Sequence, residues 1–484
     1  MALNTPSPSS PFSANPAPLW QTPVDDAPKA TDSVLFLARG RLLVIALTVL
    51  LIVPIYGAFM TQTEVTAAPT LPVEPVVRGK ILAADGSILA DGPVTQRSYP
   101  YGDLAGNLLG FTGAVQPDGS YGLEGLEYSL DSALQAGQNI TLTIDPHLQS
   151  AAEHNLRSAA LEFEAETGSA VVLEVGTGRI LASASYPPID PNDWRGASSA
   201  QMVNRPFVYA YEPGSVIKPI LVAAALESGR LSTSDIIETP MALRVGLKTF
   251  QDVAFHDPTL TPRDILAFSS NSGMIHIGQR FSSAEYAEWL ERFGFGTRLN
   301  LKTVANRGGL INNPESWVPQ DHAAASIGQS FTTTALQLAA AYQIIANDGV
   351  YVPPTINPAE ELPAPTRVLS EQTARDVRDM LMHTMNQGGL RNAQIPGVLT
   401  GGKTGTSDVY SVAEGRYIPG DYAVSFAGMV PADAPQYVVV VTLEKPRTNT
   451  SSTYTAAPLF RSIASEVLAA NGIAPAPPEV LAQQ

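Results

Sequence analysis

The sequence predicts a multi-domain α/β protein in which helices cover both faces of a sheet, with a helical insertion and a small β-rich module ahead of it. Its 484 residues exceed one ordinary core, so more than one folded unit is expected. The runs SAVVLEV (169–175) and YVVVVTL (437–443) are almost continuously apolar, which suits strands buried on both faces. Helix-like segments cluster in the middle of the chain, which favours a layered sheet over strict alternation of strands and helices.

Composition excludes several classes of function. The hydrophobic content is 44% and the charged content 15%, as expected of a folded chain with a sizeable core. A net charge of −16 repels phosphate backbones, so we expect no nucleic-acid partner. The absence of cysteine rules out disulfides, cysteine zinc sites, thiol catalysis and a lipid-modified N-terminal cysteine. The six histidines are scattered and lack the HExxH spacing of a zinc hydrolase, so no metal site is expected.

One segment near the N-terminus has the length of a membrane span. Leu42–Met60 is nineteen residues long and carries no charge, which matches an α-helix crossing the hydrocarbon layer. A cleaved signal peptide or a buried core helix is the alternative, although the apolar stretch of a signal peptide is usually shorter. Arg39 and Arg41 precede the segment, and no Lys or Arg follows before Arg78. The positive-inside rule therefore predicts a single-pass protein of the cell membrane with a cytoplasmic N-terminus and an extracytoplasmic remainder.

The chain divides by composition into six segments. They are a disordered cytoplasmic tail (1–33), a transmembrane anchor (34–60), a spacer (61–77), a small N-terminal module (78–138), a large catalytic unit (139–472) and a disordered tail (473–484). The module includes a predicted β-hairpin, RGKILAADGSILADG, that turns at Asp85-Gly86.

Three long helices are predicted in the large unit. They are DPHLQSAAEHNLRSAALEF (145–163), TTTALQLAAAYQIIAND (332–348) and PLFRSIASEVLAANG (458–472). The last of these places Leu459, Ile463 and Val467 on one face and closes at Gly472.

A serine and a lysine lie three residues apart in YEPGSVIKP (211–219). The preceding Pro-Gly breaks the chain, so a helix is expected from about Val216, with Ser215 at its cap and Pro219 in its first turn. Apolar residues surround this helix, so Lys218 is expected to be buried one turn from Ser215. Burial favours the neutral amine, which could take the hydroxyl proton and make Ser215 a nucleophile without histidine. The same spacing also arises by chance, as a capping serine beside a surface lysine.

Two further polar segments follow downstream. In TPRDILAFSSNSG a helix is expected to begin at Thr261–Pro262, and Ser269 and Asn271 fall in the turn before the next helix. There a hydroxyl and an amide could bridge a lysine and a substrate carbonyl group. GVLTGGKTGTSDVY suggests an edge strand, in which Lys403 suits a carboxylate and Gly405 lets another backbone approach. A plain helix connection and a glycine-rich hairpin are the alternatives.

Taken in order, Ser215–Lys218, Ser269–Asn271 and Lys403–Gly405 resemble the Ser-x-x-Lys, Ser-x-Asn and Lys-Thr-Gly signature of penicillin-binding proteins and serine β-lactamases. The segments YEPGSVIKP, GGKTGTS, SIGQSFTTTALQLAAAYQIIANDG, RGKILAADGSILADG and YGLEGLEYSLDSAL look like those of class B penicillin-binding proteins. The resemblance covers about residues 75–470. It implies the penicillin-binding transpeptidase or serine β-lactamase-like fold, a mainly antiparallel sheet between helices with an all-helical subdomain.

The resemblance implies a monofunctional peptidoglycan D,D-transpeptidase that needs no cofactor. Ser215 would attack the carbonyl between the two terminal D-alanines of a stem peptide and form an acyl-enzyme, which an amine of a neighbouring stem resolves. β-Lactams would acylate the same serine. Lys218 would be the proton shuttle, Ser269 would relay a proton to the leaving amine, and Asn271 would hold the acyl side-chain amide.

The Lys-Thr-Gly segment would bind the terminal carboxylate of the stem peptide or β-lactam. Lys403 and the hydroxyls of Thr404 and Thr406 would grip this carboxylate, on either side of Gly405. The backbone N–H groups of Ser215 and Thr406 would form the oxyanion hole.

The resemblance also implies partners. Stem peptides on lipid II-derived glycan strands would be the substrates. The stretch before the catalytic unit leaves no room for a glycosyltransferase domain, so we expect a polytopic SEDS-type glycosyltransferase to contact Leu42–Met60 and the module. The alternatives are a D,D-carboxypeptidase or β-lactamase-like hydrolase, and a catalytically weak scaffold that activates a partner polymerase.

Overall fold

A five-stranded antiparallel sheet lies at the centre of the computed structural model, which describes residues 77–411 and 413–474. The strands run in the order β14-β15-β16-β4-β5, so β14 forms one edge. Their bounds are β14 Gly401–Ser411, β15 Arg416–Val430, β16 Tyr437–Glu444, β4 Thr167–Glu174 and β5 Ile180–Tyr186. All four pairings are antiparallel, as the family resemblance implies.

Both faces of the sheet are buried, as the apolar runs predict. In β16, Val439 and Val441 belong to the core beneath α5 (Pro146–Glu162) and α14 (Ala456–Ala470). Val438 and Val440, which alternate with them, belong to the core on the opposite face, where α12 (Ala335–Ala346) packs on the sheet; α7 (Lys218–Glu227) contributes to the same core. Successive side chains of a strand point to opposite faces, so a strand covered on both faces favours apolar residues at consecutive positions.

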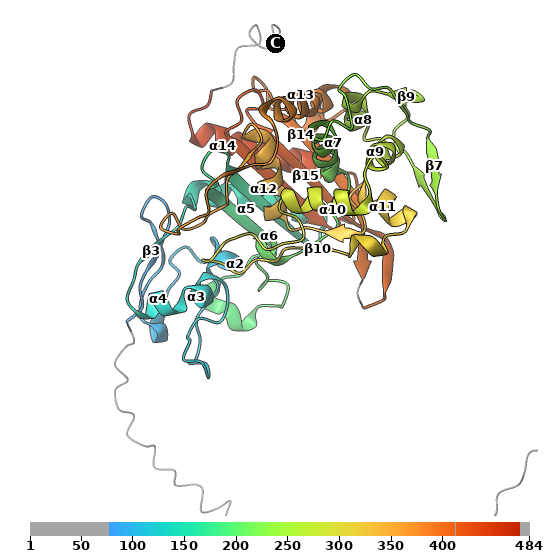
Figure 1. The fold of residues 1–484 in the computed structure, drawn as a ribbon. Coiled ribbons are helices and arrows are strands. Elements are labelled where there is room, and N and C mark those ends of the chain that lie inside the picture. The colour runs from blue at the N-terminus through green and yellow to red at the C-terminus, as the bar shows by residue number, and fades with distance from the viewer. Residues whose placement is uncertain (1–76, 412, 475–484) are drawn as a thin grey trace, which may run out of the picture. The chain divides into compact units, whose positions relative to one another are not determined.

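The three long predicted helices are confirmed as α5, α12 and α14 (Figure 1). The Asp145 carboxylate caps α5 by accepting from the backbone N–H groups of His147 and Leu148. Thr334 and Gln337 form a capping box at the start of α12. The predicted face of α14, which contains Leu459, Ile463 and Val467, is buried.

The predicted helical insertion lies between β5 and β14 in the sequence. Its α-helices besides α7 and α12 are α6 Arg205–Val208, α8 Pro262–Phe268, α9 Asn271–Gly278, α10 Ser283–Arg292, α11 Pro319–Ala325 and α13 Glu371–Gln387. Its short strands are β6 Ile237–Glu238, β7 Ala242–Val245, β8 Lys248–Gln251, β9 Thr259–Leu260, β10 Leu310–Ile311, β11 Phe331–Thr332, β12 Val350–Tyr351 and β13 Thr366–Arg367. Helix α13 packs against α7, α8 and β14, so the insertion meets the edge of the sheet (Figure 1).

The predicted N-terminal hairpin is confirmed, and its sheet includes one further strand. Strands β1 (Ile81–Leu82) and β2 (Ile88–Ala90) pair antiparallel. Strand β3 (Ile140–Thr141) pairs parallel with β1, so the sheet joins the hairpin to the start of the predicted catalytic unit. The helices between them are α2 Gly106–Leu109, α3 Gly125–Ser129 and α4 Asp131–Gln135.

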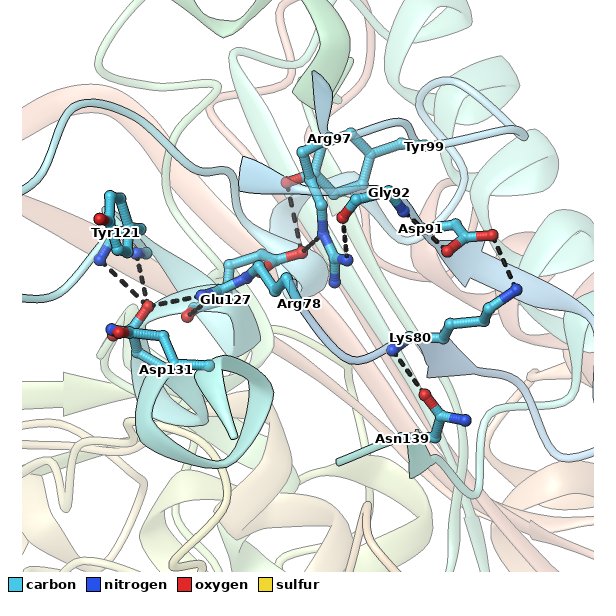
Figure 2. A network of polar contacts seen from close by, with 12 residues as sticks. Arg78, Lys80, Asp91, Gly92, Arg97, Tyr99, Tyr121, Glu127, Asp131 and Asn139 are labelled. Carbon is cyan, nitrogen blue, oxygen red and sulfur yellow. Dashed lines mark hydrogen bonds and ion pairs between the residues drawn. The ribbon is translucent and has the colours of Figure 1, made fainter. Parts of the chain in front are cut away.

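A buried network of ion pairs links this hairpin to α3 and α4 (Figure 2). The guanidinium of Arg78 contacts Glu127 at 2.6 Å and Asp131 at 2.8 Å, and Arg97 contacts the second oxygen of Glu127 at 2.7 Å. Tyr99 also donates its hydroxyl to Glu127. Because a buried charge is costly unless it is paired, this network fixes how the hairpin and the two helices pack.

The predicted tail, membrane anchor and most of the spacer fall in residues 1–76, and the end of the C-terminal tail falls in residues 475–484; both lie outside the described residues. Among helices in residues 77–411 and 413–474, none combines the length and the apolar character needed to cross a bilayer. The boundaries between the six predicted segments remain predictions.

Candidate active site

The three motifs meet at one cavity of about 670 Å³. Ser215, Ser269, Asn271, Lys403 and Thr406 all line it, although they come from parts of the chain far apart in sequence. Thr404 lines the same cavity. Lys218 lies buried behind this lining and is 0% exposed. The edge strand β14 therefore forms one wall of the cavity, and the α8–α9 junction and the turn before α7 form others.

Ser215 lies in a 3-10 turn, Gly214–Ile217, and α7 begins only at Lys218. The prediction that Ser215 caps the helix is therefore wrong, because the residue at the N-cap of α7 is Ile217. The placement of Pro219 in the first turn of α7 is confirmed. Residues three apart eclipse one another in a 3-10 turn, so the serine and the lysine are still directed to the same side.

Close backbone packing explains the turn. Gly214 has φ +59°, and a Cβ on it would lie 2.7 Å from the carbonyl oxygen of Thr406. A Cβ on Gly405 would lie 2.7 Å from the carbonyl oxygen of Pro213. The backbone that approaches Gly405 is thus the turn of the same chain that contains Ser215. This contact presses the turn against β14 and leaves no room for a regular helix start.

Lys218 is held by groups from the α8–α9 junction. Its Nζ donates to the carbonyl oxygen of Ser269 at 2.6 Å and to Oδ1 of Asn271 at 2.8 Å, and it lies 3.2 Å from Oγ of Ser269. Burial, reinforced by the nearby cation of Lys403, holds the pKa of Lys218 well below its usual value; the charge of Asp252 opposes this shift. The neutral amine predicted from the sequence is therefore the form that this site favours.

Lys403 contacts the same hydroxyl from the other side. Its Nζ donates to Oγ of Ser269 at 3.0 Å and to the carbonyl oxygen of Thr404 at 3.3 Å. Burial lowers the pKa of Lys403 to about 7. Oγ of Ser269 therefore lies between two lysine nitrogens, which is the arrangement a proton relay requires.

The Ser-x-Asn segment is placed by a sharp junction between two helices. Ser269 ends α8 in the left-handed conformation (φ 56°), and Ser270 caps α9 by accepting from the backbone N–H of Gly273. The prediction that Asn271 lies in the turn before this helix is wrong, because Asn271 is the first residue of α9. Its Nδ2 donates to the carbonyl oxygen of Gln251 at 2.8 Å, so both ends of its amide are fixed.

Asp252, which the sequence analysis did not single out, fixes this junction. Its Oδ1 accepts from the backbone N–H groups of Asn271 and Ser272, and its Oδ2 from the hydroxyls of Ser270 (2.6 Å) and Ser272 (2.8 Å). Nε2 of the buried His256 lies 2.8 Å from the same oxygen. These bonds keep the pKa of Asp252 below its usual value despite burial. An Asp and a His four residues apart before a helix start were the available signal, and a weak one.

Strand β14 presents its free edge beside the cavity, as its predicted position at the sheet edge requires. Thr406 is exposed, and its hydroxyl donates to Oγ of Ser452 at 3.1 Å. Unpaired backbone groups at such an edge can bind an extended peptide. In the described part of the chain, no three His, Asp or Glu side chains gather as metal ligands would.

The family is established by comparison with known proteins. The model of the penicillin binding protein transpeptidase domain matches residues 168–465. The chain belongs to this family. Penicillin-binding protein PbpB of Mycolicibacterium smegmatis is 33% identical over 438 residues, which cover 80% of this chain and 67% of that protein. Peptidoglycan D,D-transpeptidase FtsI of Escherichia coli K12 is 32% identical over 409 residues, 79% of this chain and 68% of that protein.

Solved structures agree. The crystal structure of penicillin binding protein 3 from Mycobacterium tuberculosis complexed with aztreonam superposes with a TM-score of 0.75 at 31% identity, covering 84% of this chain and 98% of that chain. The chain is a class B penicillin-binding protein, and its activity is that of a peptidoglycan D,D-transpeptidase, an acyl transferase. Peptidoglycan is the substrate, and β-lactams bind proteins of this family.

The arrangement around Asp252 leads to a prediction. Asp252→Asn keeps the size of the side chain but removes the charge that favours the ammonium form of Lys218, so the pKa of Lys218 falls further. The rise of benzylpenicillin acylation with pH is expected to begin at lower pH than in the wild type. Its maximum is expected to fall about tenfold, because the hydroxyls of Ser270 and Ser272 lose a charged acceptor.

Acylation rate constants measured across pH test this. Asp257→Asn is the matched control, because it removes the charge of an exposed carboxylate five residues further along the chain. It should change neither the maximum nor the position of the rise. An Asp252→Asn profile that superposes on the wild-type profile would contradict the positioning role.

Proposed function

We propose that Ser215 is the nucleophile of the transpeptidase and that Lys218 is its general base. The observation that carries this proposal is the set of groups around Lys218. The carbonyl oxygen of Ser269 and Oδ1 of Asn271 can only accept hydrogen bonds. A neutral amine satisfies both with its two N–H bonds and keeps its lone pair for a hydroxyl proton.

The reaction follows in two steps. Oγ of Ser215 attacks the carbonyl carbon between the two terminal D-alanines, and its proton passes to Lys218. The C–N bond then breaks, and the departing D-alanine takes a proton through Oγ of Ser269, which lies between Lys218 and Lys403. An amine of a second stem peptide attacks the ester carbonyl in the same way. An amide bond forms, and Ser215 leaves with a proton.

The remaining residues bind the substrate. Lys403 and the hydroxyls of Thr404 and Thr406 receive the terminal carboxylate at the edge of β14, where Gly405 lets the turn at Pro213 approach the strand. The backbone N–H groups of Ser215 and Thr406 receive the oxyanion; the contact between Gly214 and Thr406 holds their two segments together. Asn271 holds the amide of the acyl group.

The nucleophile is tested by mass spectrometry. Wild-type protein incubated with benzylpenicillin is expected to gain one penicilloyl group, mapped to the peptide that contains Ser215, and Ser215→Ala is expected to gain none. Ser269→Ala is the matched control: it lines the same cavity, keeps the nucleophile and should still be acylated, only more slowly. An adduct that persists in Ser215→Ala would show that Ser215 is not the nucleophile.

The two lysines predict a bell-shaped pH dependence. Acylation rises with pH as Lys218, whose pKa is lowered, becomes neutral and able to accept a proton. It falls as pH rises through about 7, because Lys403 then loses the charge that grips the carboxylate. The measurement is kcat/KM for D-alanine release from a D-Ala-D-Ala peptide against pH, which reports the free enzyme. In Lys403→Arg the cation persists, so the falling limb should disappear while the rising limb remains; a falling limb unchanged in that variant would exclude Lys403.

We also propose that Leu42–Met60 anchors the protein in the cell membrane with the catalytic domain outside, and that a SEDS-type glycosyltransferase contacts this segment and residues 78–138. The uncharged length of the segment and the arginines before it support the anchor. Replacing Leu42–Met60 by an unrelated apolar span should keep the protein in the membrane fraction but weaken co-purification of the glycosyltransferase. Recovery of the protein in the soluble fraction when residues 1–60 are present would contradict the anchor.

A further inference from the structure

A second cavity, of about 630 Å³, adjoins the catalytic one. Three segments contribute neighbouring residues to both cavities. The catalytic cavity is lined by Ser215, Gln329 and Thr406. The second cavity is lined by residues close to them in sequence, which are Glu212, Ser330 and Ser407. The two cavities therefore share a wall made of the turn that contains Ser215, strand β14 and the segment before β11.

Glu212 is fixed in this wall by three hydrogen bonds. Its carbonyl oxygen accepts from Oγ of Ser407 at 2.6 Å. Its Oε1 accepts from the backbone N–H of Ser330 at 2.9 Å and from the hydroxyl of Tyr417 at 2.7 Å. Its Oε2 is buried and has no partner among the described residues. One oxygen of the carboxylate is thus anchored, and the other lacks a hydrogen-bond donor among the described residues.

The second cavity is acidic. Four carboxylates line it, those of Glu212, Asp321, Asp408 and Glu444, and none of the described residues that line it is Lys, Arg or His. Glu444 is 5% exposed. Its charge is partly balanced by Arg205, whose Nη1 lies 3.8 Å from Oε2 of Glu444. Asp408 makes no side-chain hydrogen bond within the described part of the chain. We call this space the acidic cavity.

Its polar and aromatic lining suits a cation. Tyr211 is 7% exposed, and its hydroxyl has no hydrogen-bond partner among the described residues. A buried hydroxyl left unpaired in a cavity wall is costly unless a ligand completes it. Trp317, Tyr410 and Tyr417 also line the cavity. Aromatic faces attract ammonium groups, and carboxylates bind them by charge-assisted hydrogen bonds.

We propose that the acidic cavity binds the primary ammonium group of a stem peptide, with Glu212 and Asp408 as its charge partners. The proposal rests on Ser215 being the nucleophile. The catalytic cavity contains Lys403 and suits the carboxylate end of the substrate, whereas the acidic cavity behind the same wall suits an amine. Opposite charges on the two sides of Ser215 would orient a peptide that carries both groups. The ammonium can belong to the acylating peptide or to the second peptide that resolves the acyl-enzyme.

The test uses the full-length protein and a variant that combines Glu212→Gln with Asp408→Asn. Gln keeps an oxygen for Ser330 and Tyr417, so only the charge is lost. Asp433→Asn, which neutralises an exposed carboxylate outside the cavity, is the matched control. Acylation by benzylpenicillin, which carries no ammonium group, should be unchanged in both variants and shows that the site is folded. If Glu212→Gln does not fold, Asp408→Asn alone serves, because it breaks no hydrogen bond of the described residues.

Two measurements distinguish the two peptides. The first is kcat/KM for D-alanine release from a lysine-containing D-Ala-D-Ala peptide relative to its twin with an acetylated lysine amine. The second uses the acetylated peptide as acyl donor and a lysine peptide as acceptor, and measures the ratio of amide product to hydrolysed product. We expect the double variant to lower one of these ratios about tenfold, while Asp433→Asn lowers neither.

Each outcome decides the proposal. A fall in the first ratio assigns the cavity to the acylating peptide, and a fall only in the second assigns it to the accepting peptide. Both ratios unchanged in the double variant, with benzylpenicillin acylation intact, would overturn the proposal. A failure of the nucleophile assignment is distinguishable, because the wild-type penicilloyl group would then map away from Ser215.

Discussion

The proposed chemistry of this protein depends on the burial of one lysine without a carboxylate partner. Lys218 is completely buried, and within the described residues its nitrogen is surrounded by a carbonyl, an amide oxygen and a hydroxyl. A carboxylate at hydrogen-bond distance would have stabilised the ammonium form and removed the proposed base. Asp252, the carboxylate whose charge opposes the lowered pKa of Lys218, instead accepts hydrogen bonds from Ser270, Ser272 and the backbone at the start of α9. It positions Asn271 and leaves the amine free to be neutral.

The sheet makes this arrangement possible because it is rigid on both faces and open at one edge. Helices bury every residue of β16, so the sheet cannot move without disrupting two cores. Strand β14, at the edge, presents Lys403 and Thr406 to the cavity from a fixed position. Backbone contact between Gly405 and the turn at Gly214 then ties Ser215, the proposed nucleophile, to that edge. Two glycines thereby set how closely the turn that contains Ser215 approaches the strand that contains Lys403.

The two adjoining cavities differ in the sign of the charged side chains that line them. Lys403 brings a cation to the lining of the catalytic cavity, and Glu212, Asp408 and two further acids line the neighbouring cavity. The overall charge of −16 does not predict this separation, because it says nothing about where the few lysines lie. A ligand with a carboxylate and an amine meets complementary fields on the two sides of one wall, which favours a single orientation of binding.

The sequence by itself determined the elements and the chemistry class. Apolar runs identified the buried strands, the pair Thr261–Pro262 located a helix start, and three short motifs indicated the family. Only the tertiary structure decided that Ser215 lies in a 3-10 turn, that Asp252 holds the Ser-x-Asn junction, and that an acidic cavity adjoins the site. The physical reason is the separation along the chain over which each kind of signal acts. Periodicity and capping act over a few residues along the chain, whereas the contacts of Gly214 with Thr406 and of Asp252 with Asn271 join segments that only packing brings together.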